Sequence, residues 1–114
     1  MAVIPDILNA GLDRGVASFH AQIEQQTGDF ARSLPDTHQV LACVFLPGGH
    51  QIIATWFGYQ EPDLLVVDGT DERGRQVRLL AARTDVHIVL TAVKRIADRP
   101  AQPVAFQPRT DGPV

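Results

Sequence analysis

The chain has 114 residues, of which 45% are hydrophobic and 20% charged, and its formal net charge is −3. That length is sufficient for one domain with a single core and too short for two. The single cysteine, Cys43, excludes an intrachain disulfide and a cysteine-based zinc site.

The N-terminal region lacks the features of a secretory signal. It has no basic leader, and Asp6 interrupts its apolar stretch. No segment approaches the roughly 20 consecutive apolar residues that a membrane helix needs. These features predict a cytoplasmic protein that does not bind membranes.

Charge is divided unevenly along the chain. Residues 1–72 hold ten acidic residues against two basic ones, and residues 73–114 hold eight basic residues against three acidic ones. One interpretation is a molecule with an acidic and a basic face. The other is that neighbouring strands pair acids with bases on a solvated surface.

A helix is expected first, over about residues 6–27. Asp6 is a suitable N-cap and Gly28 a natural stop. Apolar residues between them recur at three- and four-residue spacing: Leu8, Leu12, Val16, Phe19 and Ile23. A short helical turn over 29–34 is expected to follow and to end at Pro35.

Five strands are expected next, within about residues 39–94. Val-, Ile- and Leu-rich segments at 39–46, 50–59, 64–67, 75–82 and 86–94 are separated by recognisable turns. Links this short predict an antiparallel meander, because parallel neighbours need a crossover of a dozen or more residues. The predicted fold is therefore mainly β with an N-terminal helix, its five-stranded antiparallel sheet being strongly curved or closed into a small barrel.

Three of these strands, 39–46, 64–67 and 86–94, are apolar on both faces. An open antiparallel sheet with one solvated face should alternate apolar and polar residues. One helix covers only part of the second face, so we expect a partner surface, most simply another copy of the chain.

Residues 1–96 are expected to form a single domain. Residues 97–114 hold four of the eight prolines and have no periodic apolar pattern. This composition predicts an extended or disordered tail.

No catalytic motif is present, whether a nucleophile elbow, a phosphate-binding glycine loop or a zinc-binding pair of histidines. The four histidines are scattered, and Glu61 and Asp63 are interpreted as turn formers around Pro62. The sequence therefore predicts no catalytic residue, no metal site and no cofactor.

Basic residues in the second half, with aromatic residues near them, are the candidate binding residues. Such a combination can follow a phosphate backbone and stack bases. The candidates for binding RNA or single-stranded nucleic acid are Tyr59, Arg73, Arg75, Arg78, Arg83, Lys94 and Arg95. The alternative for the neighbouring Trp56 and Phe57 is that both are core residues.

The segment 44–56 has alternating apolar residues, a turn that ends in Gly49 and a bent second strand, and the matching stretch continues to Leu65-Val66-Val67. It resembles the first motif of the Sm/Hfq-like family of small barrels, and Thr91-Ala92-Val93 is similar to the end of the family's final strand. This resemblance implies an SH3-like small-barrel fold and association of subunits into rings through sheet edges.

Three functions remain open at this stage. The first is a non-enzymatic, oligomeric small barrel that binds RNA or single-stranded nucleic acid. The second is a protein-interaction module, such as an adaptor, inhibitor or assembly subunit. The third is a small-molecule-binding protein or enzyme with a helix packed inside a curved sheet, as in cystatin-like or NTF2-like folds.

Overall fold

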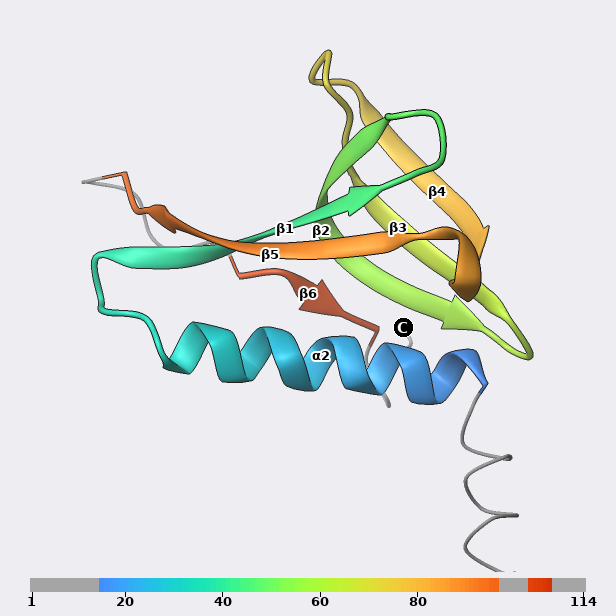
Figure 1. Ribbon diagram of the computed structural model, residues 1–114, viewed down its shortest axis with the longest axis horizontal. Helices are drawn as coiled ribbons and strands as arrows, with labels where there is room; N and C mark the ends of the chain where they lie inside the picture. Colours follow the sequence, from blue (N-terminus) through green and yellow to red (C-terminus); the bar gives the residue numbers. More distant parts are fainter. Residues whose placement is uncertain (1–14, 97–102, 108–114) are drawn as a thin grey trace, which may run out of the picture.

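A computed structural model describes residues 15–96 and 103–107. Within these residues a helix precedes an antiparallel sheet, as the sequence predicted (Figure 1). The elements are α2 (Val16–Arg32), β1 (His38–Phe45), β2 (Gln51–Gln60), β3 (Leu64–Thr70), β4 (Gln76–Ala82), a 3-10 turn η1 (Arg83–Asp85), β5 (His87–Lys94) and the short β6 (Ala105–Phe106). Within the described ranges, no helix is long and apolar enough to cross a membrane.

Helix α2 continues beyond the predicted stop. It passes through Gly28 and reaches Arg32, so residues 29–32 of the expected turn over 29–34 are part of the same helix. Ser33 then ends it, donating its backbone N–H to carbonyl groups of the last turn. A single glycine costs a helix interior only about 1 kcal/mol, which the packing of the helix on the sheet outweighs. The predicted cap Asp6 lies outside the described residues.

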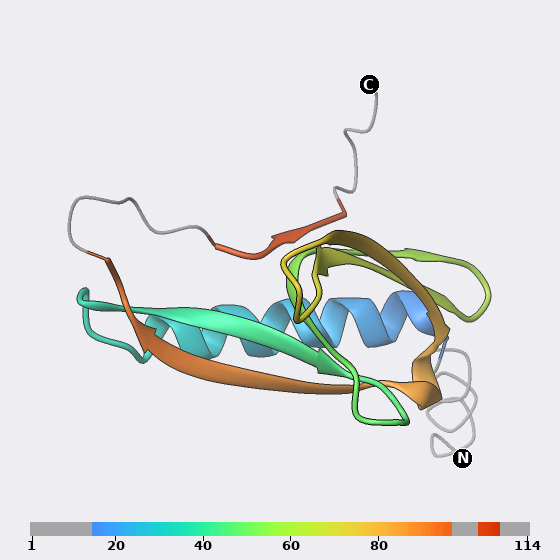
Figure 2. The same cartoon turned by 90° about the horizontal axis from the view of Figure 1, so that it is seen from above.

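The sheet is open. Its strand order is β4-β3-β2-β1-β5, with every neighbouring pair antiparallel, so β4 and β5 are its two edges. In Figures 1 and 2 the β3–β4 hairpin runs obliquely to β1 and β5, yet the sheet is neither closed nor strongly curled. The prediction of a closed or strongly curved sheet is therefore wrong, because β5 pairs with β1 and nothing pairs it with β4.

Helix α2 packs on one face of this sheet, which we call the inner face. Alternate residues of every strand point to it, and the buried core consists of Val16 and Ile23 from α2 with Ala42, Val44, Ile52, Ala54, Phe57, Leu65, Val67 and Val86. A backbone hydrogen bond from Val16 N to the Pro62 carbonyl, 3.2 Å long, fixes the start of α2 at the β2–β3 turn. The core thus lies between one helix and one sheet face.

A β-bulge in β2 changes which face its aromatic residues occupy. The pairing of β2 with β3 shifts between Ala54 and Trp56, so one extra residue lies in β2. Phe57 consequently joins Ala54 on the inner face and is fully buried, whereas Trp56 turns to the outer face and is half-buried. Of the two aromatic residues that the sequence offered as core residues, only Phe57 lies in the core.

Part of the predicted tail is extended and docked on the sheet. Residues 103–107 return to the body, where β6 pairs in parallel with β2. Val104 and Phe106 pack against the buried core. The proline-rich composition of the segment is compatible with this pairing, because proline lacks a backbone N–H and a strand pair of only two residues needs few such donors.

Candidate interaction edge

Clustered metal ligands are not found in the part of the chain that the structure describes: no three His, Cys, Asp or Glu side chains gather there. The remaining candidates are the predicted basic residues and the faces and edges of the sheet.

Three of the predicted arginines are held by carboxylates. Arg78 donates to both carboxylate oxygens of Asp68, at 2.6 and 2.8 Å. The Nε atoms of two others reach acids at 2.8 Å, Arg75 to Asp71 and Arg83 to Asp63. Each pair joins an acid from the acidic part of the chain to a base from the basic part. The uneven charge distribution is thus explained by pairing on a solvated surface, at least at these three positions.

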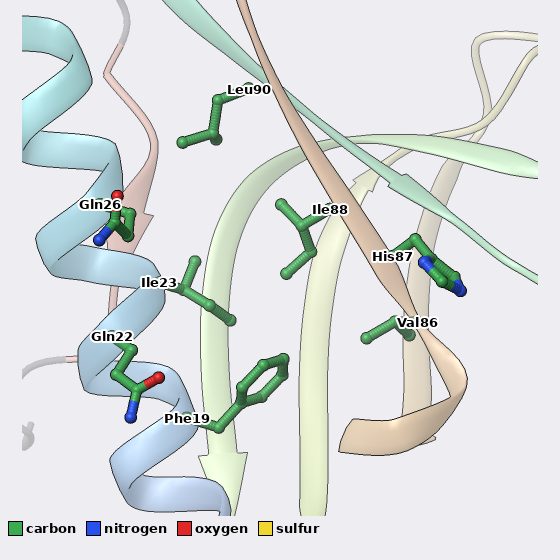
Figure 3. A pocket seen from close by; sticks show the side chains of 8 residues that line it. All are labelled: Phe19, Gln22, Ile23, Gln26, Val86, His87, Ile88 and Leu90. Atoms are coloured by element: carbon green, nitrogen blue, oxygen red, sulfur yellow. The ribbon is translucent and has the colours of Figure 1, made fainter.

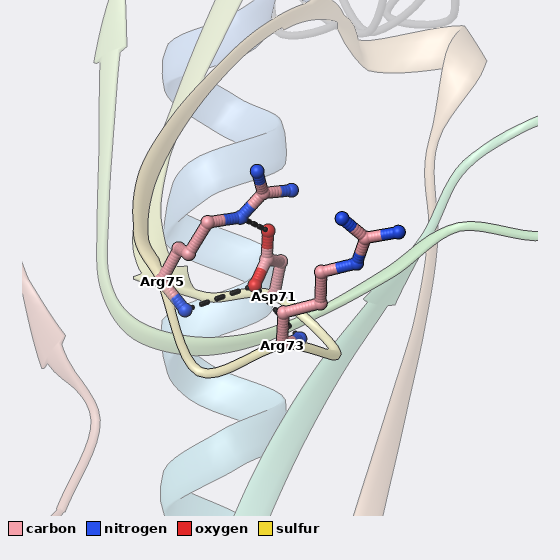
Figure 4. Close-up of polar contacts among 3 residues, drawn as sticks. All are labelled: Asp71, Arg73 and Arg75. Atoms are coloured by element: carbon pink, nitrogen blue, oxygen red, sulfur yellow. Dashed lines mark hydrogen bonds and ion pairs between the residues drawn. The ribbon is translucent and has the colours of Figure 1, made fainter.

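Asp71 organises the tip of the β3–β4 hairpin (Figure 4). Its Oδ1 accepts hydrogen bonds from the backbone N–H groups of Arg73 and Arg75, both at 2.9 Å, and its Oδ2 accepts one from Arg75 Nε. Donors to a carboxylate favour its charged form, so these bonds hold the pKa of Asp71 below its usual range. The carboxylate therefore acts as a turn former, and the guanidinium of Arg73 points away from it.

On the outer face, Trp56, Asp68 and Arg78 form a compact unit. Asp68 and Arg78 face each other across β3 and β4, and the Arg78 guanidinium lies 5.9 Å from the centre of the Trp56 ring. Gly58 lies beneath that ring, where a Cβ atom would come within 2.1 Å of the indole. Hydrogen bonds from Arg78 lower the pKa of Asp68. The guanidinium is held by its neighbours on both sides.

The remaining predicted residues lie elsewhere. Tyr59 is on the inner face with its ring 4.9 Å from that of His20. Arg95 Nη1 donates to the Asp36 carbonyl at 3.1 Å and so supports the loop between α2 and β1. Lys94 ends β5, opposite His38. The seven candidates therefore do not gather on one face.

The two edge strands are unusual in their composition. Natural edge strands are protected by charged side chains, proline, bulges or shortness. β5 has eight residues with a single charged one, Lys94 at its end, and β4 has seven with only Arg78 charged. Leu80 on β4 is 59% exposed and Val89 on β5 is 47% exposed, and both point to the outer face. Both edges are suited to pairing with another strand.

A groove runs beside the β5 edge, between β5 and α2 (Figure 3). Its volume is about 360 Å³, and its lining consists of Phe19, Gln22, Ile23 and Gln26 from α2 with Val86, His87, Ile88 and Leu90 from the β5 side. A strand added to β5 would place alternate side chains over Phe19 and Ile23. Such strand addition combines backbone hydrogen bonds with side-chain pockets.

Sequence reasoning did not find this groove. It placed Phe19 and Ile23 on the apolar stripe of the helix, but the groove forms because β5 is an edge strand whose residues line it opposite α2. The one sequence signal for it was the apolar character of segment 86–94 on both faces.

Comparison of the chain with protein-family models, with curated proteins and with solved structures finds no match in any of the three.

Proposed function

We propose that this protein is a non-enzymatic assembly module that associates with further copies of itself by adding β4 of one copy to β5 of the next. The observation that carries the proposal is the pair of long, weakly protected edges at opposite ends of one sheet. Pairing of unlike edges is heterologous, so it produces rings where the rotation closes and filaments where it does not.

The inner faces of the two strands are complementary. On β4, Val77, Leu79 and Ala81 are half-buried and pack at the border of the core. Added to β5 of another copy, these side chains would enter the groove beside Phe19 and Ile23. The sheet and its core would then continue from one copy into the next.

The outer faces favour the same arrangement. Leu80 and Val89 are exposed apolar side chains on the two edges. Pairing of β4 with β5 would place them at one junction and remove apolar area from water on both sides. Pairing of two β5 strands would leave Leu80 exposed.

Light scattering after gel filtration tests the proposal. We expect the wild-type chain to form particles that are multiples of its 12.4 kDa mass. Val89→Lys blocks β5 and Leu80→Lys blocks β4, and each variant alone should be a monomer, because a desolvated lysine at the junction is unfavourable. Gln25→Lys, at an exposed position of α2 outside the groove, is the matched control and should leave the mass unchanged.

Mixing the two edge variants identifies the pairing. Each retains the edge that the other lacks, so an equimolar mixture should contain a particle of twice the chain mass. A Leu80→Lys variant that stays dimeric by itself would show that β5 pairs with β5. A wild-type chain that stays monomeric at about 100 µM, well above the Kd of a standard interface, would overturn the proposal.

A further inference from the structure

β1 and β2 diverge within the sheet. They pair only from Ala42 to Phe45 of β1, against Gln51 to Ala54 of β2. Beyond the bulge, residues 56–60 of β2 pair with β3 on one side, and residues 38–41 of β1 pair with β5 on one side. The opening between residues 38–41 and 56–60 is here called the β1–β2 slot.

The chain itself fills part of this slot. Residues 103–107 run parallel to β2, with Ala105 beside Trp56 and Phe106 beside Phe57. The backbone N–H of Gln107 donates to the Phe57 carbonyl at 2.8 Å, and the Tyr59 N–H donates to Gln107 Oε1 at 2.9 Å. The edge of β2 therefore binds an extended segment through its backbone and one glutamine amide.

An aromatic pocket receives Phe106. The centre of its ring lies 5.5 Å from that of Phe57 in a stacked arrangement and 5.6 Å from that of His20 in a T-shaped one. His20 is 4% exposed, and its Nε2 donates to the Phe57 carbonyl at 3.0 Å, which fixes the imidazole in place. The pocket is thus built from rigid side chains and selects an aromatic residue.

The occupant leaves the β1 side of the slot unfilled. A cavity of about 350 Å³ lies between the segment, α2 and the start of β1, and a second of about 220 Å³ lies between the segment, β1 and β2. Both are lined by Pro103, Val104 and Val40. Among these residues, Val104 belongs to the docked segment, and its small side chain leaves both cavities unfilled.

We propose that the β1–β2 slot is a binding site for an extended peptide of another molecule, with residues 103–107 as its intramolecular occupant. The peptide runs parallel to β2 and has the pattern large aliphatic, small, Phe, Gln. Its aliphatic residue fills the space that Val104 leaves, its Phe enters the His20–Phe57 pocket, and its Gln accepts from Tyr59 N. This site lies on an inner strand edge and is separate from the β4 and β5 edges of the proposed assembly.

The affinity expected for an added peptide depends on competition with residues 103–107 for the slot. A tethered segment acts at an effective concentration of the order of millimolar, so it hinders any peptide in solution. Weakening the tethered segment should therefore strengthen peptide binding, whereas loss of the pocket would abolish it. These opposite signs separate a binding site from a merely structural contact.

The test is binding of a labelled peptide with the sequence of residues 102–109 to full-length variants, followed by fluorescence anisotropy. We expect Phe106→Ala and Gln107→Ala chains to bind this peptide about tenfold more tightly than the wild-type chain does. Ala105→Ser, at an exposed position of the same segment, is the control and should bind like wild type. Trp56, the chain's only tryptophan, lies beside the segment and gives a second readout through its fluorescence.

Peptide variants complete the test. A peptide with Leu in place of Val104 should bind severalfold more tightly than the parent, and one with Ala in place of Phe106 should not bind. Gln107→Ala removes only one acceptor, so it remains informative if Phe106→Ala does not fold. Absence of parent-peptide binding by folded Gln107→Ala, or binding that ignores the peptide's Phe, would overturn the proposal whatever the assembly state.

Discussion

Asp68 and Arg78 carry the best-formed ion pair among the described residues, with two hydrogen bonds across adjacent strands. Exposed ion pairs are generally weak, but two parallel bonds from one guanidinium give this pair a fixed geometry. Trp56 adds a third contact on the ring face of Arg78. Three residues from three strands are thereby joined on a surface that is otherwise solvated.

The Asp68–Arg78 pair should make the free energy of unfolding decrease as the pH is lowered into the acid range. Arg78 lowers the pKa of Asp68 below 3.8, so the stabilisation is complete above that value and is lost as the pH falls through the lowered pKa. Asp68→Asn should therefore reduce stability at neutral pH and flatten its decline below pH 3.8. Urea unfolding at pH 7 and at intervals below pH 4 measures this. Asp85→Asn is the control, and an Asp68→Asn chain that keeps the wild-type acid profile would contradict the prediction.

At the scale of single elements, most boundaries were predictable. Gly, Pro and Asp turns interrupt the apolar runs, and the observed strands begin and end near those turns. β3 was predicted to stop at Val67, because Asp68, Gly69 and Thr70 resemble a loop in composition. They continue the strand because Arg78 pairs with Asp68 and the backbone of β2 lies close to Gly69. Both causes are contacts with other strands, which a local pattern cannot reveal.

The bulge in β2 was equally hidden. Nothing in Ala54-Thr55-Trp56 marks an extra residue, and the feature that permits it lies on β3. The same limit applies to the interaction edge and to the β1–β2 slot. Both depend on which strands become neighbours, and the sequence indicated only that too many strand faces were apolar.

Gly69 should be indispensable to the bulge. A Cβ atom there would lie 2.1 Å from the Ile53 carbonyl oxygen, which belongs to the backbone and cannot move aside. We expect Gly69→Ala to destabilise the protein by about 1–3 kcal/mol, in the range of overpacked core sites. Gly74→Asn is the matched control. Its site has positive φ and open space, which asparagine tolerates, so the loss should stay below about 1 kcal/mol. Equal losses in urea unfolding would refute the steric argument.

At the scale of the whole molecule, the arrangement of charge bears on whether the protein can bind nucleic acid. Three arginines of the candidate nucleic-acid set are each paired with a carboxylate, while Arg73 and Lys94 make no ion pair within the described part of the chain. Binding of RNA stays a prediction. The three arginine–carboxylate ion pairs lower the affinity for RNA that these arginines would otherwise provide. Assembly through sheet edges does not depend on these charges.

Labelled poly-U therefore should bind weakly, with little change between about 50 and 200 mM salt, because few basic groups are available to displace counterions. Fluorescence anisotropy at the two salt concentrations checks this. Combining Asp63→Asn, Asp68→Asn and Asp71→Asn releases the three arginines, and this chain should gain salt-sensitive binding. Binding by the wild-type chain that weakens steeply with salt would contradict this prediction and support the nucleic-acid-binding hypothesis.

The strand order also determines at which point during synthesis of the chain the sheet can be completed. β1 pairs along its whole length with β5, which lies about 40 to 60 residues further along the chain. A ribosome adds about 5–20 residues per second, so several seconds separate the synthesis of these two strands. During that interval one edge of β1 has no partner from its own chain. Pairings between such distant residues are also slow to form, typically over milliseconds to seconds. The nascent chain is thus most open to wrong pairings before its fifth strand is made.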